Sequence, residues 1–359
     1  MSKKIITIVG ARPQFIKAAT VSRELQKVGV NEQIIHTGQH FDDNMSDIFF
    51  RQMEIPKPAY NLDINSLSHG AMTGRMLEQL EIVFQKENPD MVIVYGDTNS
   101  TLAGALAAQK LHIPVAHVEA GLRSYNMNMP EETNRILTDR ISSILFCPTD
   151  KAVQNLEQEG FKSIPTKIIK SGDVMQDAAL FYKEKAKLFS TVINDFNLSN
   201  RSYILCTIHR QENTDDNNRL SQIIMALNEL SKNYTIVLPL HPRTRKIIAE
   251  QKIKLDFSPI EPVGYFDMIE LLQHCSFVVT DSGGLQKEAF FFGKFCLTTR
   301  DETEWVELVE NGFNVIVGAI HNRIIEETHK IQNTTKNFNI NLYGNGKASR
   351  LIAEEILKF

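Results

Sequence analysis

"FVVTDSGGLQKEAFFFGKFCL", residues 277–297, reads as a short apolar strand, a turn with two glycines, a helix and the start of another strand. A strand that continues through a helix into the next strand of the same sheet lies parallel to it. The run over 277–280 is apolar without alternation, which is typical of a strand buried on both faces. This unit therefore predicts a parallel sheet with helices on both sides.

The same alternation of short apolar runs and longer amphipathic stretches, such as 14–28, 71–87 and 99–111, repeats along the chain. The expected strands lie in two series: 5–10, 32–38, 91–97, 114–121, 144–149 and 167–172, then 203–210, 235–242, 277–284, 294–300 and 314–318. The fold class is therefore expected to be α/β, with two Rossmann-like, doubly wound domains.

With 359 residues, the chain suits two domains of ~150–200 residues each. The alternation lapses over 183–202, which is polar and lacks a buried strand, and then restarts. We expect an N-terminal Rossmann-like domain over 1–175 and a C-terminal one over 176–345. The segment 346–359 is expected to form a helix that packs back across the domains.

Composition narrows the class of function. Hydrophobic residues make up 42% and charged residues 23%, and the net charge is −4, so nucleic acid is not an expected partner. No run approaches the ~18 apolar residues of a membrane helix, and no export signal is visible. The cysteines stand singly, without CxxC spacing, which favours reduced thiols in the core of a cytoplasmic protein: Cys147, Cys206, Cys275 and Cys296.

In open parallel sheets, ligands bind beyond the carboxyl ends of the strands. Polar residues follow many of the expected strands: Arg12, Gln39, His40, Asp97, Glu119, His209, His241, Arg243, Ser282 and Arg300. We take this set as the source of candidate site residues.

Ser282, Gly283 and Gly284 precede a helix, where free backbone amides and the helix dipole favour an anion such as phosphate. Glu288 lies one helical turn further on and could accept hydrogen bonds from the hydroxyls of a ribose. The alternative is a serine N-cap followed by a glycine-rich turn.

GARPQFIK (10–17) follows the first expected strand with a guanidinium at Arg12 and an ammonium at Lys17. Arg12 could bind a diphosphate through its fork while Lys17 supports the site, and a solvated pair of cations is the alternative. The stretch is not the GxGxxG pattern, which argues against a dinucleotide.

Acidic residues follow two strands and begin a later helix: Asp97, Glu119, and Glu131 or Glu132. Partial burial of such carboxylates would raise their pKa toward values useful for proton transfer. Each could instead be a helix N-cap, Asp97 above all. His209 with Arg210, and His241 with Arg243, suit an anionic ligand; no spacing in the sequence favours a metal site.

Taken in order, GARPQFIK, GDTNST (96–101), HVEAGLRS (117–124), MPEETNR (129–135), TIHRQEN (207–213), LHPRT (240–244) and TDSGG (280–284) resemble the non-hydrolysing UDP-N-acetylglucosamine 2-epimerase family. The resemblance covers almost the whole chain. It implies the two-domain architecture of GT-B glycosyltransferases, a UDP-sugar in the cleft between the halves, a homodimer and no cofactor.

The resemblance also implies a reaction, in which UDP leaves C1 of the sugar as the C2 proton is removed and both are then added back. The roles it implies here are proton transfer by Asp97, Glu119 and Glu131; leaving-group stabilisation by Arg12, His209, Ser282, Gly283 and Gly284; and support by Lys17 and Arg135. His241 and Arg243 belong to the expected substrate-binding set, and Glu288 keeps the ribose.

Two departures point to a branch of the family. Residues 300–307 read RDETEWVE where RDxTERPE is usual, and the loop SYNMNMPEE (124–132) is short. Both resemble the branch acting on UDP-2,3-diacetamido-2,3-dideoxyglucuronate. The candidate contacts for its C3 acetamido group and carboxylate are Arg123, Asn126, Asn128 or Arg300. Asp42, beside Gln39 and His40, argues against a second UDP-sugar as activator.

The competing hypotheses are a hydrolysing UDP-N-acetylglucosamine 2-epimerase, a GT-B glycosyltransferase and a non-catalytic sensor of UDP-sugars. Each would use the same nucleotide site.

Overall fold

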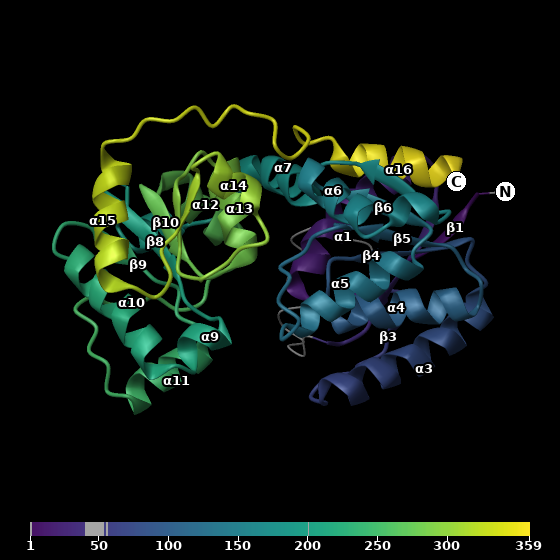
Figure 1. The fold of residues 1–359 in the computed structure, drawn as a ribbon, viewed down its shortest axis with the longest axis horizontal. Coiled ribbons are helices and arrows are strands. Elements are labelled where there is room, and N and C mark those ends of the chain that lie inside the picture. The colour runs from purple at the N-terminus through teal and green to yellow at the C-terminus, as the bar shows by residue number, and fades with distance from the viewer. Residues whose placement is uncertain (1, 40–53, 55–56, 200) are drawn as a thin grey trace. The chain divides into compact units, whose positions relative to one another are not determined.

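The computed structural model describes residues 2–39, 54, 57–199 and 201–359, and the chain forms two compact units (Figure 1). The first unit comprises Met1–Ala178 together with Asn341–Phe359, and the second comprises Ala179–Ile340. The C-terminal segment therefore returns to the unit in which the chain begins.

The first unit is built on a seven-stranded sheet with the order β3-β2-β1-β4-β5-β6-β7, in which every paired neighbour is parallel. Its strands are β1 (Lys4–Val9), β2 (Asn31–His36), β3 (Tyr60–Asn61), β4 (Met91–Tyr95), β5 (Val115–Val118), β6 (Ile144–Cys147) and β7 (Lys167–Lys170). The chain winds outward in one direction from β1 and in the other from β4. Their carboxyl ends therefore form the topological switch point, where such sheets bind ligands.

Helices cover this sheet: α1 (Arg12–Lys27), α3 (His69–Glu87), α4 (Asn99–Lys110), α5 (Pro130–Ile141), α6 (Asp150–Gln158), a 3₁₀ turn (Phe161–Ser163) and α16 (Ala348–Lys358). Helix α16 packs on α1 and buries Ile352 and Ile356. The carboxylate of Asp177 caps α16 by accepting from the amides of Ala348, at 3.2 Å, and Ser349, at 2.7 Å. The last residues are thus an integral part of the first unit.

The second unit holds a five-stranded parallel sheet with the order β12-β11-β10-β8-β9. Its strands are β8 (Tyr203–Thr207), β9 (Thr235–Val237), β10 (Phe277–Thr280), β11 (Cys296–Thr298) and β12 (Asn314–Ile316), and its helices are α8 (Val192–Asp195), α9 (Gln211–Thr214), α10 (Asn217–Leu230), α11 (Pro242–Glu250), α12 (Tyr265–His274), α13 (Gly283–Phe291), α14 (Val306–Glu310) and α15 (His321–Gln332). Helix α7 (Val174–Phe189) leads from the first unit into the second.

Successive residues of β8 join different cores in the second unit. Ile204 and Cys206 pack into one apolar cluster, and Tyr203 and Leu205 pack into another. Because alternate side chains of a strand point to opposite faces, both faces of this sheet are covered. The expected α/β fold with doubly wound parallel sheets is confirmed, and each apolar run forms a strand.

Two local features could not be predicted from the pattern of apolar runs. Strand β3 is two residues long and has no apolar run, so periodicity did not reveal it. The polar stretch 183–202 is largely helical, in α7 and α8.

The cysteines are free and buried, and burial raises the pKa of Cys275 and Cys296 to about 12. None of the helices in the described part of the chain has the length and apolar character needed to span a bilayer.

Candidate active site

A pocket of about 210 Å³ lies in the first unit at the β1–β4 switch point. Its walls include the starts of α1, α3 and α5 and the turn after β4, and its lining includes the side chains of Lys17, His69, Asp97 and Glu131. Pockets that enclose a drug-sized ligand usually measure about 300–1,000 Å³. This pocket therefore suits one part of such a ligand, for example a sugar ring.

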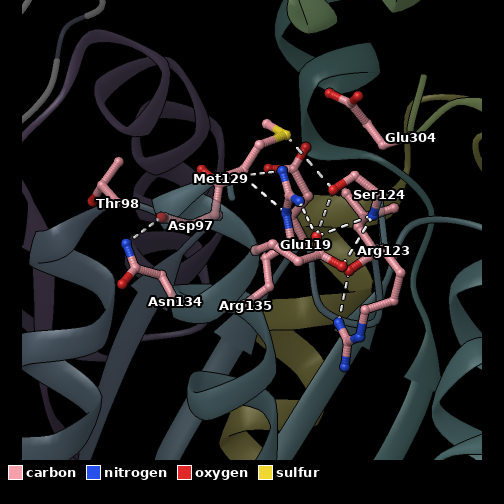
Figure 2. A network of polar contacts seen from close by, with 12 residues as sticks. Asp97, Thr98, Glu119, Arg123, Ser124, Met129, Asn134, Arg135 and Glu304 are labelled. Atoms are coloured by element: carbon pink, nitrogen blue, oxygen red, sulfur yellow. Dashed lines mark hydrogen bonds and ion pairs between the residues drawn. The ribbon is translucent and has the colours of Figure 1, made fainter. Parts of the chain in front are cut away.

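Asp97 stands in the turn between β4 and α4, and its carboxylate is about one-third exposed. Arg135 donates to Asp97 Oδ2 from Nη2 at 2.7 Å and from Nε at 3.0 Å, and Asn134 donates to the Asp97 carbonyl at 2.9 Å (Figure 2). Helix α4 is capped by Thr98, whose hydroxyl accepts from the amide of Thr101. The N-cap alternative for Asp97 is therefore wrong, and its carboxylate is oriented by α5.

Glu119 follows β5 with a φ of +74°, a left-handed conformation that costs about 1–3 kcal/mol for a residue of this kind. Its carboxylate forms an ion pair with the ammonium of Lys17, and the side chains are only 10% and 9% exposed. The pair rests on Gly96, where a Cβ would stand 3.2 Å from Lys17 Nζ and 3.3 Å from Glu119 Oε2. Gly96 itself has a φ of +63°. The close approach of the ion pair and this left-handed backbone conformation therefore both favour glycine at position 96.

The two glutamates at the start of α5 do different things. Glu131 is partly exposed and lines the pocket. Glu132 is buried and accepts hydrogen bonds from the amides of Ser124 and Tyr125, each at 3.0 Å, and from Arg135 at 2.5 Å. Burial by itself would raise the pKa of Glu132, but these amides and Arg135 outweigh it and lower the pKa. Glu132 thus anchors a loop as a carboxylate, and Glu131 faces the pocket.

Gln14 is a site residue to which the sequence analysis assigned no role. Its Oε1 accepts from the amides of Gly10, at 2.8 Å, and Ala11, at 3.0 Å. Its Nε2 donates to the Tyr95 carbonyl at 2.8 Å and to the Thr98 hydroxyl at 2.9 Å. One buried amide therefore ties the turn after β1 to the turn after β4. The sequence signal that could have identified Gln14 is its place as a polar residue in the first turn of a helix that follows a strand.

In the second unit, His209 lies just beyond β8, and its side chain is 44% exposed. The buried carboxylate of Asp281 accepts from the backbone amides of His209 and Arg210, each at 3.0 Å, and lies 3.4 Å from His209 Nδ1. Partial burial lowers the pKa of His209; Asp281 opposes this shift, and the charges of Arg210 and His241 add to it. From the sequence, Asp281 was only one residue of the motif TDSGG. In the structure its carboxylate fixes the backbone at His209 and Arg210.

The Ser-Gly-Gly turn begins α13. Ser282 Oγ accepts from the amide of Leu285 at 3.4 Å, so the serine is the N-cap of the helix. A Cβ at Gly283 would stand 2.4 Å from Glu304 Oε1. A Cβ at Gly284 has no closer neighbour among the described residues than Ser282 Oγ, at 4.0 Å. The absence of a side chain at Gly283 therefore makes room for Glu304, whereas a side chain at Gly284 would extend into open space.

Other expected ligand-binding residues of this unit already have protein partners. Arg300 is buried after β11 and donates to Glu304 at 2.9 Å. Arg243 forms an ion pair with Asp215, and His241 caps α11 by accepting from the Arg243 amide at 3.2 Å.

The remaining candidates include residues of α13 and α1. Glu288 is buried on α13. Arg12 begins α1, but its side chain, like His40 and Asp42, lies outside the described residues. Gln39 is described, and its Oε1 accepts from the amide of Ser100 at 3.1 Å. Within the described ranges, no three His, Cys, Asp or Glu residues gather in a way that could hold a metal ion.

Comparison with known proteins gives a consistent result. The family model described as UDP-N-acetylglucosamine 2-epimerase matches residues 23–357. The UDP-2,3-diacetamido-2,3-dideoxy-D-glucuronate 2-epimerase of Pseudomonas aeruginosa is 57% identical over 358 residues, or 99% of each chain. The crystal structure of the Methanocaldococcus jannaschii UDP-GlcNAc 2-epimerase in complex with UDP-GlcNAc and UDP is 42% identical, with a TM-score of 0.91 over 99% of this chain and 100% of the other.

The Neisseria meningitidis UDP-GlcNAc 2-epimerase bound to UDP-GlcNAc is 35% identical, with a TM-score of 0.90 over 99% of this chain and 100% of the other. A family model that spans most of the chain, and relatives of this identity along its whole length, confirm the prediction made from the motifs. The chain belongs to the UDP-N-acetylglucosamine 2-epimerase family.

Proposed function

We propose that this protein inverts C2 of a UDP-linked 2-acetamido sugar by eliminating UDP and adding it back. The observation that carries the proposal is the pocket at the β1–β4 switch point, which Asp97 and Glu131 line. Lys17, a third lining residue, holds the carboxylate of Glu119. Asp97 and Glu131 thus line a space that suits a sugar ring, and Glu119 is paired with a lysine of its wall. Epimerisation needs groups that remove and return a proton.

The substrate proposed is UDP-2,3-diacetamido-2,3-dideoxy-D-glucuronate, which would be converted to the mannuronate form. Support comes from the 57% identity to the Pseudomonas aeruginosa enzyme of that name, which extends over 99% of both chains. UDP-N-acetylglucosamine is the second candidate, since the Methanocaldococcus jannaschii enzyme named for it is 42% identical. A homodimer, expected from the family, and a cytoplasmic location, expected from the singly placed cysteines, are part of the same proposal.

The proposed chemistry begins with a base that removes the C2 proton while the bond between C1 and the UDP oxygen breaks. The electron pair of the C2–H bond becomes the C1–C2 double bond of a 2-acetamidoglucal, and UDP leaves with the pair of the C1–O bond. In the return step, an acid delivers a proton to the opposite face of C2 and the UDP oxygen attacks C1. We assign the proton transfers to Asp97, Glu119 and Glu131.

Because a C2–H beside an amide is a weak acid, stabilising the departing diphosphate is the larger part of the work. We assign this to the second unit, where the amides at the start of α13 and the helix dipole favour an anion. His209 adds a donor: its lowered pKa favours the neutral ring, which still carries one N–H. Glu288, one turn into α13, is proposed to accept from the ribose hydroxyls.

The test is to incubate the protein in D₂O with each of the two candidate substrates and to follow C2 by NMR. We expect deuterium at C2 and a UDP-linked epimer, formed faster from the diacetamido uronate. Accumulation of free sugar and UDP would instead indicate a hydrolysing epimerase. Tight UDP binding without exchange at any protein concentration would indicate a sensor or, where an acceptor is glycosylated, a transferase.

The two glycines of the Ser-Gly-Gly turn should respond differently to replacement by alanine. Gly283→Ala pushes a methyl group against Glu304, so we expect a loss of about 1–3 kcal/mol of unfolding free energy. Gly284→Ala meets open space and should retain stability, but its methyl group would keep a phosphate from the backbone. We expect UDP affinity to fall about tenfold, the equivalent of about 1.4 kcal/mol. Thermal unfolding and titration calorimetry measure the two effects, and wild-type UDP binding by Gly284→Ala would contradict the assignment.

A further inference from the structure

A fully buried histidine on β5 joins the pocket to the interior of the first unit. His117 Nδ1 lies 2.7 Å from Asp139 Oδ1, and His117 Nε2 lies 2.7 Å from the carbonyl oxygen of Gly96. Gly96 directly precedes Asp97 and supports the pair formed by Lys17 and Glu119. The imidazole ring therefore contacts the backbone on which the proposed acids depend.

Both contacts of His117 are to hydrogen-bond acceptors. A carbonyl oxygen has no hydrogen to donate, so Nε2 must be the donor to Gly96. Asp139 Oδ2 accepts from Arg123 at 2.7 Å and from the Gly121 amide at 3.1 Å, so this buried, ion-paired group is a carboxylate and its Oδ1 also accepts. Each ring nitrogen at these distances therefore carries a hydrogen, which makes the ring an imidazolium.

The neighbouring charges agree with a cationic ring. Arg123 donates to Asp139 Oδ2 at 2.7 Å and forks onto Glu159 through Nε at 2.7 Å and Nη2 at 2.8 Å. One guanidinium thus faces two carboxylates, and a charged His117 brings the sum to zero. On β6, Cys147 stays a neutral thiol because burial raises its pKa. Buried charges persist only when they are paired in this way.

We propose that His117, held as an imidazolium between Asp139 and Gly96, is a positioning residue for the proton-transfer acids. It fixes the Gly96 carbonyl from one side while the Gly96 amide donates to the Val118 carbonyl at 3.0 Å on the other. Both backbone polar groups of the residue that precedes Asp97 are thereby held. The role rests on the proposed epimerase function, but the state of the ring does not.

The first experiment observes the ring in the unaltered protein. Long-range ¹H–¹⁵N NMR on protein labelled with ¹⁵N-histidine distinguishes a nitrogen that carries hydrogen from one that does not, and His117→Gln identifies the signal by its loss. We expect both nitrogens of His117 to carry hydrogen. A single unprotonated nitrogen would overturn the proposal, whatever the activity of the protein.

The second experiment measures C2 exchange in D₂O. In His117→Gln and Asp139→Asn, we expect kcat to fall about 100-fold with KM for the UDP-sugar retained, since small misplacements of catalytic groups cost about this much. His112→Asn is the matched control: this histidine is exposed before β5 at a φ of +59°, which asparagine tolerates. It should behave as wild type.

Circular dichroism establishes which variants are folded. If His117→Gln does not fold, the ring signal of His117 is identified by resonance assignment of the unaltered protein, and Asp139→Asn tests the positioning role. Wild-type kcat in a folded Asp139→Asn or His117→Gln protein would overturn the positioning role. Absence of exchange in the unaltered protein would instead overturn the proposed function, and the protonation state would stand or fall separately.

Discussion

Asp97→Asn is expected to lower the rate of C2 deuterium exchange by about 10²–10⁴-fold, the range typical of a lost general acid or base. The amide keeps the shape of the side chain and can still accept from Arg135, which holds the carboxylate at 2.7 Å, so the turn should survive. UDP affinity should be unchanged, because we assign the nucleotide to the second unit. Exchange is measured by NMR, and binding by titration calorimetry.

Asp90→Asn is the matched control for this substitution. Asp90 precedes the same strand, β4, at its other end, where it accepts from the amide of Lys4 at 2.7 Å. It should exchange deuterium as wild type does. If Asp97→Asn also exchanged at the wild-type rate, Asp97 would have no part in proton transfer, and the pocket would need another reading.

Lys17→Met is expected to lower the unfolding free energy of the first unit by about 3–5 kcal/mol. The reason is that the Lys17–Glu119 pair is about nine-tenths buried, so removing one partner leaves a carboxylate without its cation in a poorly hydrated place. The midpoint and slope of urea denaturation measure the effect.

Glu119→Gln, combined with Lys17→Met, tests whether this pair acts as a unit. The double variant should recover much of the lost stability, because two neutral side chains of similar shape replace the pair. Exchange should be lost in the double variant, since it lacks the Glu119 carboxylate that we assign to proton transfer. Strictly additive losses of stability would show that the two side chains are not energetically coupled.

Much of the fold was predictable because strands that are buried on both faces appear in the sequence as continuous apolar runs. The runs at 91–97 and 277–284 correspond to β4 and β10, each followed by a helix. Strand β3 escaped because two residues, Tyr60–Asn61, show no periodicity. The segment 346–359 was expected to form a helix that packs back across the domains, but the local pattern does not contain the fact that residues 341–359 join the first unit, because this depends on long-range packing.

The candidate site divides in a similar way. Asp97 and Glu119 could be found because they directly follow strands, and parallel strands present such residues at one edge. Gln14 and Asp281 could not be given a role, because their importance lies in buried hydrogen bonds to distant backbone groups. For Arg300, the sequence showed a cation, but the partner that faces it, Glu304, depends on how the chain turns after β11.

The docking of α16 on α1 has a consequence for synthesis on the ribosome. Residues 179–340 form their unit from one continuous stretch, so that unit can complete its fold as soon as the stretch has emerged. The first unit starts earlier but must wait for residues 341–359 before Ile352 and Ile356 cover its surface. The half of the protein that is translated first is therefore the half that finishes folding last.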